Sequence, residues 1–142
     1  MLNGETVQMK HLTKTPMEHA LEAYLNDRCI FYSDKNWLHP LFDFQSFLKR
    51  EQIPRETILL KDAIIGRAAA LLLIYLGIQH VYTPTLSRHG KEVLDYFDID
   101  YTYETLVKEI GCQTERLLQG VWQPEEAYRI ITDRIAARKG ES

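Results

Sequence analysis

The sequence predicts an α/β fold in three layers, α-β-α, built around a mixed and mostly parallel sheet of about four or five strands. One observation is an apolar unit in the middle of the chain, formed by a strand at 58–60, an apolar helix at 63–76 and a strand at 80–83. Such a unit is a βαβ crossover, whose strands are parallel and whose connection is right-handed. The other observation is that helical and strand patterns alternate along the rest of the 142-residue chain.

The part of the chain before this unit predicts two helices and one strand. Residues 15–18, Thr-Pro-Met-Glu, are typical of a helix start, so a helix is expected as far as residues 26–27. Residues 29–33 are apolar and aromatic, as in a strand, and residues 41–51 carry apolar side chains at helical spacing. The run at 58–60 that follows is apolar throughout, which predicts a central strand covered on both faces.

The part of the chain after the unit predicts three helices and one further strand. In order, these are a helix at 88–98 capped by Ser87, a strand at 99–103, a helix from about 104 to 118 that breaks at Gly111, and a helix from Pro124. The strand alternates apolar and polar side chains, which is typical of a position near the sheet edge.

Composition limits the domain organisation and the class of partner. Residues 1–14 are polar and unpatterned, so they are predicted to be a flexible N-terminal segment, and residues 15–142 are predicted to be a single domain. A net charge of −3 argues against DNA or RNA as a partner. The longest apolar run, at 68–76, is too short to span a bilayer, and no signal-peptide core is present, so we expect a cytoplasmic protein.

Residues 62–70, Asp-Ala-Ile-Ile-Gly-Arg-Ala-Ala-Ala, followed by Gly77-Ile78 and Val81-Tyr82, resemble the bacterial family DUF1893. The family pattern begins with Asp-Lys-x-x-Gly-Lys-Ala-Ala-Ala at a helix start, continues with Gly-Val-x-x-Val-Tyr, and later has Cys-Pro-Met-Glu, which corresponds to residues 112–115. The likeness covers roughly residues 18–131 and implies a cytidine-deaminase-like fold without an established activity. The family's lysine after the aspartate is Ala63 in this chain.

The residues expected on such a scaffold for zinc chemistry are missing. A zinc deaminase needs an H-x-E helix start and a P-C-x-x-C helix start to hold the metal and move protons. This chain has neither motif, and residues 62–67, where the resemblance places the paired cysteines, contain no thiol. The five histidines show no metal-ligand spacing. We therefore expect no metal and no cofactor, and not a zinc-dependent deaminase.

The helix start after the first strand of the unit holds three candidate ligand-binding residues, each with a structural alternative. Asp62 either caps the helix or faces a ligand at the carboxyl ends of the strands. Gly66 allows close approach either of the sheet or of a ligand resting on the first turn. Arg67 either pairs with a phosphate or carboxylate group or is an ordinary solvated or salt-bridged arginine.

Two later helix starts hold the other candidates. Ser87 caps the next helix, or it opens an anion-binding turn. Cys112 is either a thiol activated by its helix start, with Glu115 on the same side, or a buried small residue followed by a first-turn glutamate. Asp62 and Cys112 are the candidate catalytic residues.

Three functions remain open from the sequence. The leading hypothesis is a metal-free domain that binds a nucleotide or other small anionic metabolite at the helix starts 62–67, 87 and 112–115. The second is an enzyme without zinc that uses Asp62 or Cys112 as acid, base or nucleophile. The third is a structural module that forms a homo-oligomer through the apolar helix 63–76.

Overall fold

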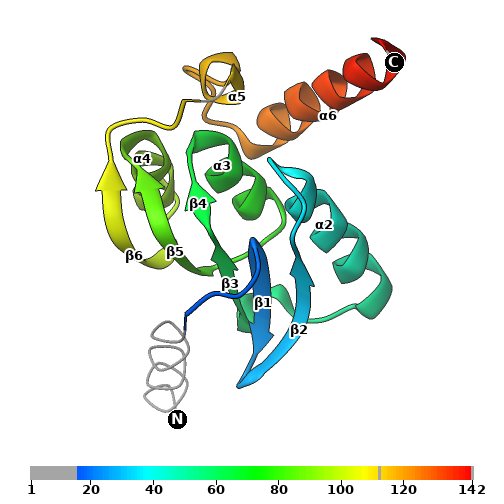
Figure 1. The fold of residues 1–142 in the computed structure, drawn as a ribbon, viewed down its shortest axis with the longest axis vertical. Coiled ribbons are helices and arrows are strands. Elements are labelled where there is room, and N and C mark those ends of the chain that lie inside the picture. The colour runs from blue at the N-terminus through cyan, green and yellow to red at the C-terminus, as the bar shows by residue number, and fades with distance from the viewer. Residues whose placement is uncertain (1–15, 112, 142) are drawn as a thin grey trace.

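A computed structural model describes residues 16–111 and 113–141 of the chain, in which helices pack on one six-stranded sheet (Figure 1). The elements, in chain order, are β1 (Leu21–Leu25), β2 (Arg28–Ser33), α2 (His39–Glu51), a 3-10 turn (Arg55–Thr57), β3 (Ile58–Asp62), β4 (Ile64–Ile65), α3 (Arg67–Tyr75), β5 (His80–Ser87), α4 (Arg88–Tyr96), β6 (Asp100–Val107), α5 (Gln113–Leu117) and α6 (Pro124–Glu141).

The sheet is mixed, with strand order β2-β1-β3-β5-β4 and β6 on the other side of β5. Strand β1 is antiparallel to β2 and β3, whereas β3, β4 and β6 are all parallel to β5. Leu60 of β3 lies opposite Val81, and Ile65 of β4 lies opposite Leu86, so β3 and β4 follow one another along the same side of β5. The predicted α/β class with a mixed sheet is confirmed, with six strands in place of four or five.

The centre of the sheet is buried on both faces. Leu60 and Val81 belong to the main core, which joins the sheet to helices α2, α3, α4 and α6. Successive residues of a strand point to opposite faces, so Leu59, Lys61 and Tyr82 lie on the other face. They are 3 %, 0 % and 6 % exposed, respectively. On this second face Leu59 and Tyr82 pack with Met17 and Tyr24, whereas α2, α3, α4 and α6 contribute to the main core, so a helical layer over the second face stays a prediction.

The predicted βαβ unit is confirmed as β3–α3–β5, with its two strands parallel. Every residue of α3 from Arg67 to Leu73 is buried, so the apolar character of this helix is explained by packing within the chain. The apolar character of residues 63–76 therefore no longer argues for a homo-oligomer, and oligomerisation through this helix stays a prediction. Among the described helices, none has both the length and the apolar character needed to cross a bilayer.

The predicted first helix is wrong where the structure describes it, because residues 21–25 form β1. Strand β1 is hydrogen-bonded to a neighbour on each side, β2 and β3. The Glu22 carboxylate accepts hydrogen bonds from the backbone N–H groups of Glu18 and His19, at 2.8 and 3.0 Å. Tertiary pairing thus overrides the helix-start pattern, whose first residue, Thr15, lies outside the described ranges.

Two predicted helix boundaries are also wrong. The apolar helix begins at Arg67 and not at 63, because Ile64 and Ile65 pair with β5 as strand β4. Residues 104–107, predicted to open a helix, complete strand β6, which pairs with β5 as far as Val107. Both segments contain β-branched side chains, which favour a strand when a partner strand is beside them.

Replacing Gly90 by Ala is expected to lower the free energy of unfolding by about 1–3 kcal/mol. A Cβ at this position of α4 would lie 2.9 Å from the carbonyl oxygen of Ile65 and 3.1 Å from backbone atoms of Gly66. Those backbone atoms are fixed by β4 and α3, so the clash outweighs the ~1 kcal/mol that alanine gains over glycine in a helix. Urea denaturation of the variant measures the effect.

The matched control is Gly111→Ala, because a Cβ on Gly111 would meet nothing within 4 Å. The two substitutions add the same methyl group, so an equal effect on unfolding at both positions would contradict close packing at Gly90.

Candidate functional site

The start of α3 is capped by a side chain from a distant part of the chain. Glu115, in α5, accepts hydrogen bonds from the backbone N–H of Arg67 (to Oε2, 2.8 Å) and of Ala68 (to Oε1, 3.2 Å). The first N–H groups of a helix have no partner within the helix, and a negative charge at this end is favoured by the helix dipole. The carboxylate of Glu115 therefore occupies the position at which an anion would bind to α3.

Gly66 makes this cap possible. It is the N-cap residue of α3, in extended conformation, and its own position supplies no side-chain cap. A Cβ on Gly66 would lie 2.2 Å from Oε1 of Glu115 and 3.0 Å from Cδ1 of Ile110. The close approach predicted at this glycine is thus made by a carboxylate of the chain itself.

Arg67 is buried, at 5 % exposure, and its side chain fixes the segment between α5 and α6. Its Nε and Nη2 groups donate to the carbonyl oxygen of Val121 at 2.9 and 2.6 Å, and its guanidinium lies 4.4 Å from the ring centroid of Trp122. Burial lowers the pKa of Arg67 from its usual value, and nearby Glu92 and Glu115 oppose that shift.

Ser87 serves as a cap in the structure. Its side chain is fully buried, and its Oγ accepts a hydrogen bond from the backbone N–H of Gly90 at 2.9 Å, in the first turn of α4. The predicted helix start is therefore confirmed. A ligand-binding role for Ser87 stays a prediction, because its hydroxyl oxygen already accepts this hydrogen bond.

Asp62 ends β3 and is partly buried. Loss of solvent raises the pKa of its carboxyl group from 3.8 to about 7, and hydrogen bonds with the backbone of Ile64 and Ala63 lower it in part. The interpretation of Asp62 as the cap of the apolar helix is wrong, since Glu115 caps that helix.

A pocket of about 730 Å³ lies where α3, α4 and α5 meet, and we call it the α3–α5 pocket. Trp122 and the segments 109–111 and 119–120 form part of its wall. Its ionisable lining residues carry both signs of charge and are Arg67, Arg116, Glu92, Glu109, Glu115 and His89. Its volume is in the range of pockets that hold small molecules.

The predicted ligand residues are only partly brought together. Gly66, Arg67 and Glu115 are in direct contact, and the last two line the α3–α5 pocket. Asp62 and Ser87 do not line this pocket. Cys112 lies outside the described residues, so a cleft shared by Asp62 and Cys112 stays a prediction.

Sequence reasoning missed five lining residues with ionisable or aromatic side chains. His89 and Glu92 come from α4, Glu109 follows β6, Arg116 is in α5 and Trp122 precedes α6. Glu92 and Arg116 lie in helices as ordinary charged residues, which carry no sequence signal. Trp122 was the one detectable candidate, because a tryptophan in a loop beside Pro124 is an unusual place for a large ring.

Comparison with known proteins adds a family to this geometry. A family model described as TM1506, domain of unknown function (DUF1893), matches residues 9–135. The chain belongs to the DUF1893 family. The crystal structure of a DUF1893 family protein (TM1506) from Thermotoga maritima is similar, with a TM-score of 0.74 and 22 % sequence identity over 91 % of this chain and 88 % of that one. No curated protein matches the chain.

The residues at this site of the DUF1893 chain do not suit a zinc ion. The α3 start presents Gly66 and Arg67, and both carboxylate oxygens of Glu115 accept backbone hydrogen bonds. Among residues 16–111 and 113–141, no three His, Cys, Asp or Glu side chains gather in a group that could hold a metal ion.

Gly66→Ala and Glu115→Ala are each expected to lower the free energy of unfolding by about 1–2 kcal/mol, because both substitutions remove the same helix cap. In Gly66→Ala the carboxylate moves away from the new methyl group, which breaks its two hydrogen bonds. The double variant should therefore cost less than the sum of the single variants in urea denaturation. Additive costs would show that the two residues act independently.

Asp62→Asn is expected to become more stabilising, relative to the unsubstituted protein, as the pH rises from 5 to 8. The folded-state pKa of about 7 lies above the usual 3.8, so the folded state binds the proton more tightly. Between pH 3.8 and about pH 7 the unfolded state has lost this proton while the folded state still holds it, so the free energy of unfolding of the unsubstituted protein falls as the pH rises. Asparagine has no such proton, so the variant does not lose this stability. Urea denaturation at pH 5 and pH 8 measures the difference. Asp27→Asn, at an exposed turn, controls for the loss of one surface charge.

Proposed function

We propose that this DUF1893 domain binds a small polar metabolite, a nucleotide or other anionic compound, in the α3–α5 pocket. The observation that carries the proposal is the pocket itself, about 730 Å³ in volume and lined by three glutamates, two arginines, a histidine and a tryptophan. Binding pockets of about 300–1,000 Å³ commonly hold small molecules through a few well-placed polar groups.

The lining favours a ligand that carries both hydrogen-bond donors and an anionic group. Glu92 and Glu109 are exposed carboxylates that accept hydrogen bonds from amino or hydroxyl groups of a ligand. Arg116 is an exposed cation in the same wall. The starts of α3 and α4 are already capped by Glu115 and Ser87, so the anionic group of the ligand is assigned to arginine and not to a helix start.

The remaining features of the proposal come from the sequence and the resemblance. They are a cytidine-deaminase-like fold, a bacterial and cytoplasmic protein, no metal, and neither nucleic acid nor membrane as a partner. A non-zinc enzyme is the second candidate, supported by the raised pKa of Asp62, which suits proton transfer near neutral pH. Because Asp62 does not line the α3–α5 pocket, binding is the better supported function.

Tryptophan fluorescence tests the proposal directly. The chain has two tryptophans, and Trp122 lies in the pocket wall, so the protein is titrated with both tryptophans in place and Trp122→Phe is the control that should lose the signal. Titration with the nucleosides and nucleoside 5′-monophosphates is expected to give a saturable change for at least one of them. Native mass spectrometry of the purified protein should show the same compound class bound.

In the protein with both tryptophans in place, Glu109→Gln is expected to weaken ligand binding by about tenfold, which corresponds to one charge-assisted hydrogen bond. Glu51→Gln, at the exposed end of α2, is the matched control and should bind as before. Absence of any saturable signal, together with native spectra that show the unbound mass alone, would rule out the proposed function.

A further inference from the structure

A second pocket, between α5 and α6, has a basic lining that the proposed function does not use. It has a volume of about 320 Å³ and is lined by Thr114, Arg116, Leu117, Arg134 and Arg138, which we call the α5–α6 pocket. Among the described residues that line it, none is acidic. We propose that this pocket binds a phosphate group or a similarly compact polyanion, such as pyrophosphate.

The three arginines supply the recognition chemistry. A guanidinium group is always charged at physiological pH and offers a planar set of N–H donors that match two oxygens of a phosphate. Arg116 comes from α5, whereas Arg134 and Arg138 are one helical turn apart in α6. Their shared lining of one concave site, in a chain of net charge −3, is a local concentration of positive charge.

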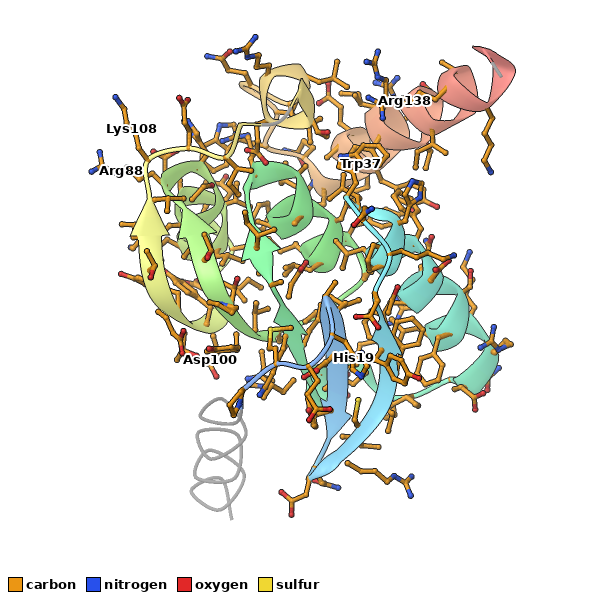
Figure 2. All side chains as sticks on the ribbon, in the orientation of Figure 1. His19, Trp37, Arg88, Asp100, Lys108 and Arg138 are labelled. Atoms are coloured by element: carbon orange, nitrogen blue, oxygen red, sulfur yellow. The ribbon has the colours of Figure 1, made fainter. Side chains whose placement is uncertain are left out.

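Trp37 fixes the geometry of this pocket. Its Nε1 donates a hydrogen bond to Oγ1 of Thr114 at 2.8 Å, and Thr114 is only 6 % exposed. The guanidinium of Arg138 lies 5.3 Å from the centroid of the Trp37 ring, and Figure 2 shows the two residues side by side, where α6 passes the segment before α2. A guanidinium group that lies over the face of a ring can still donate its in-plane N–H groups to an anion.

The backbone of Trp37 has an uncommon conformation beside this pocket. Its φ is +63°, in the left-handed region, which is rare for a bulky residue. Such a conformation persists where the surrounding structure holds it. The indole of this residue contacts both Thr114 and Arg138, two of the residues that line the α5–α6 pocket.

The form of the pocket favours a compact anion over a nucleic acid. A protein that tracks a nucleic-acid backbone needs a basic groove or stripe along several phosphates. Arg116, Arg134 and Arg138 instead line one small pocket on an acidic chain. Arg116 lines both this pocket and the α3–α5 pocket, so a bound phosphate would adjoin the ligand proposed above. The proximity of the phosphate to that ligand rests on the proposed function, whereas the phosphate site itself does not.

Isothermal titration with pyrophosphate and with inorganic phosphate tests the inference on the full chain. We expect saturable binding of pyrophosphate that weakens as salt is added. Arg134→Gln and Arg138→Gln should each weaken binding by at least tenfold, the loss of one charge-assisted interaction. The matched control is Arg129→Gln, because Arg129 lies on the same helix, is paired with Asp133 at 3.9 Å and does not line the pocket. The affinity of Arg129→Gln for pyrophosphate should equal that of the unsubstituted protein.

A Trp122→Phe variant adds a local readout, because Trp37 is then the sole tryptophan and lies beside the α5–α6 pocket. Pyrophosphate should change its fluorescence at the concentration that saturates the calorimetric signal. The inference is overturned by absence of binding to either anion, by an equal loss in Arg129→Gln, or by single-stranded RNA that binds more tightly than pyrophosphate.

The two proposals fail separately. Pyrophosphate binding without any nucleoside or nucleotide signal at Trp122 would remove the proposed function and leave the phosphate site standing. A nucleoside signal at Trp122 without pyrophosphate binding would do the reverse.

Discussion

The hydrogen bonds between the Glu115 carboxylate and the start of α3 hold the functional part of this fold together. Helix α3 is the buried centre of the molecule, and a buried helix start needs partners for its free N–H groups. Gly66 has no side chain to accept these hydrogen bonds, so the acceptor is the carboxylate of Glu115, 48 residues after Arg67. The same glycine leaves the space that the carboxylate fills. The need of α3 for a cap on its first N–H groups is thus met by the packing of α5 against it.

This contact positions a helix that cannot be stable alone. Helix α5 has five residues, far fewer than an isolated helix needs in water. It is held by Glu115 on α3, by Thr114 on the Trp37 indole, and by the buried Leu118 directly after it. Since α5 forms a wall of both pockets, their shapes depend on these long-range contacts and not on the helix propensity of the segment.

Local patterns predicted the elements whose boundaries are set locally. Helix α2, helix α4 with its Ser87 cap, and the parallel unit around α3 all follow from spacing and caps. The failures at residues 21–25 and 104–107 have one cause, which is that a partner strand converts an ambiguous segment into a strand. No single-sequence pattern reveals that partner.

The site was predictable to a similar degree. Gly66, Arg67 and Glu115 stood out individually, because a glycine, a charge and a first-turn carboxylate at helix starts each call for a physical reason. Their mutual contacts could not be predicted, since Glu115 and Arg67 are joined only by the fold. The same holds for Trp122 and Val121, whose positions follow from the buried Arg67 side chain.

The chain has two arginine–tryptophan pairs, and burial of the arginine distinguishes the pair with a structural role from the pair proposed to bind a ligand. Arg67 lies over Trp122 and Arg138 lies over Trp37, at 4.4 and 5.3 Å from the ring centroids. Arg67 is buried and directs two donor groups to the carbonyl oxygen of Val121, so its charge serves to order a loop. Arg138 is exposed and lines a pocket with two further arginines. Contact with a ring restricts the conformations of the arginine side chain in both cases, but only Arg138 also meets solvent. An anion that binds there costs little side-chain entropy, which is why the second pair, and not the first, is assigned to a ligand.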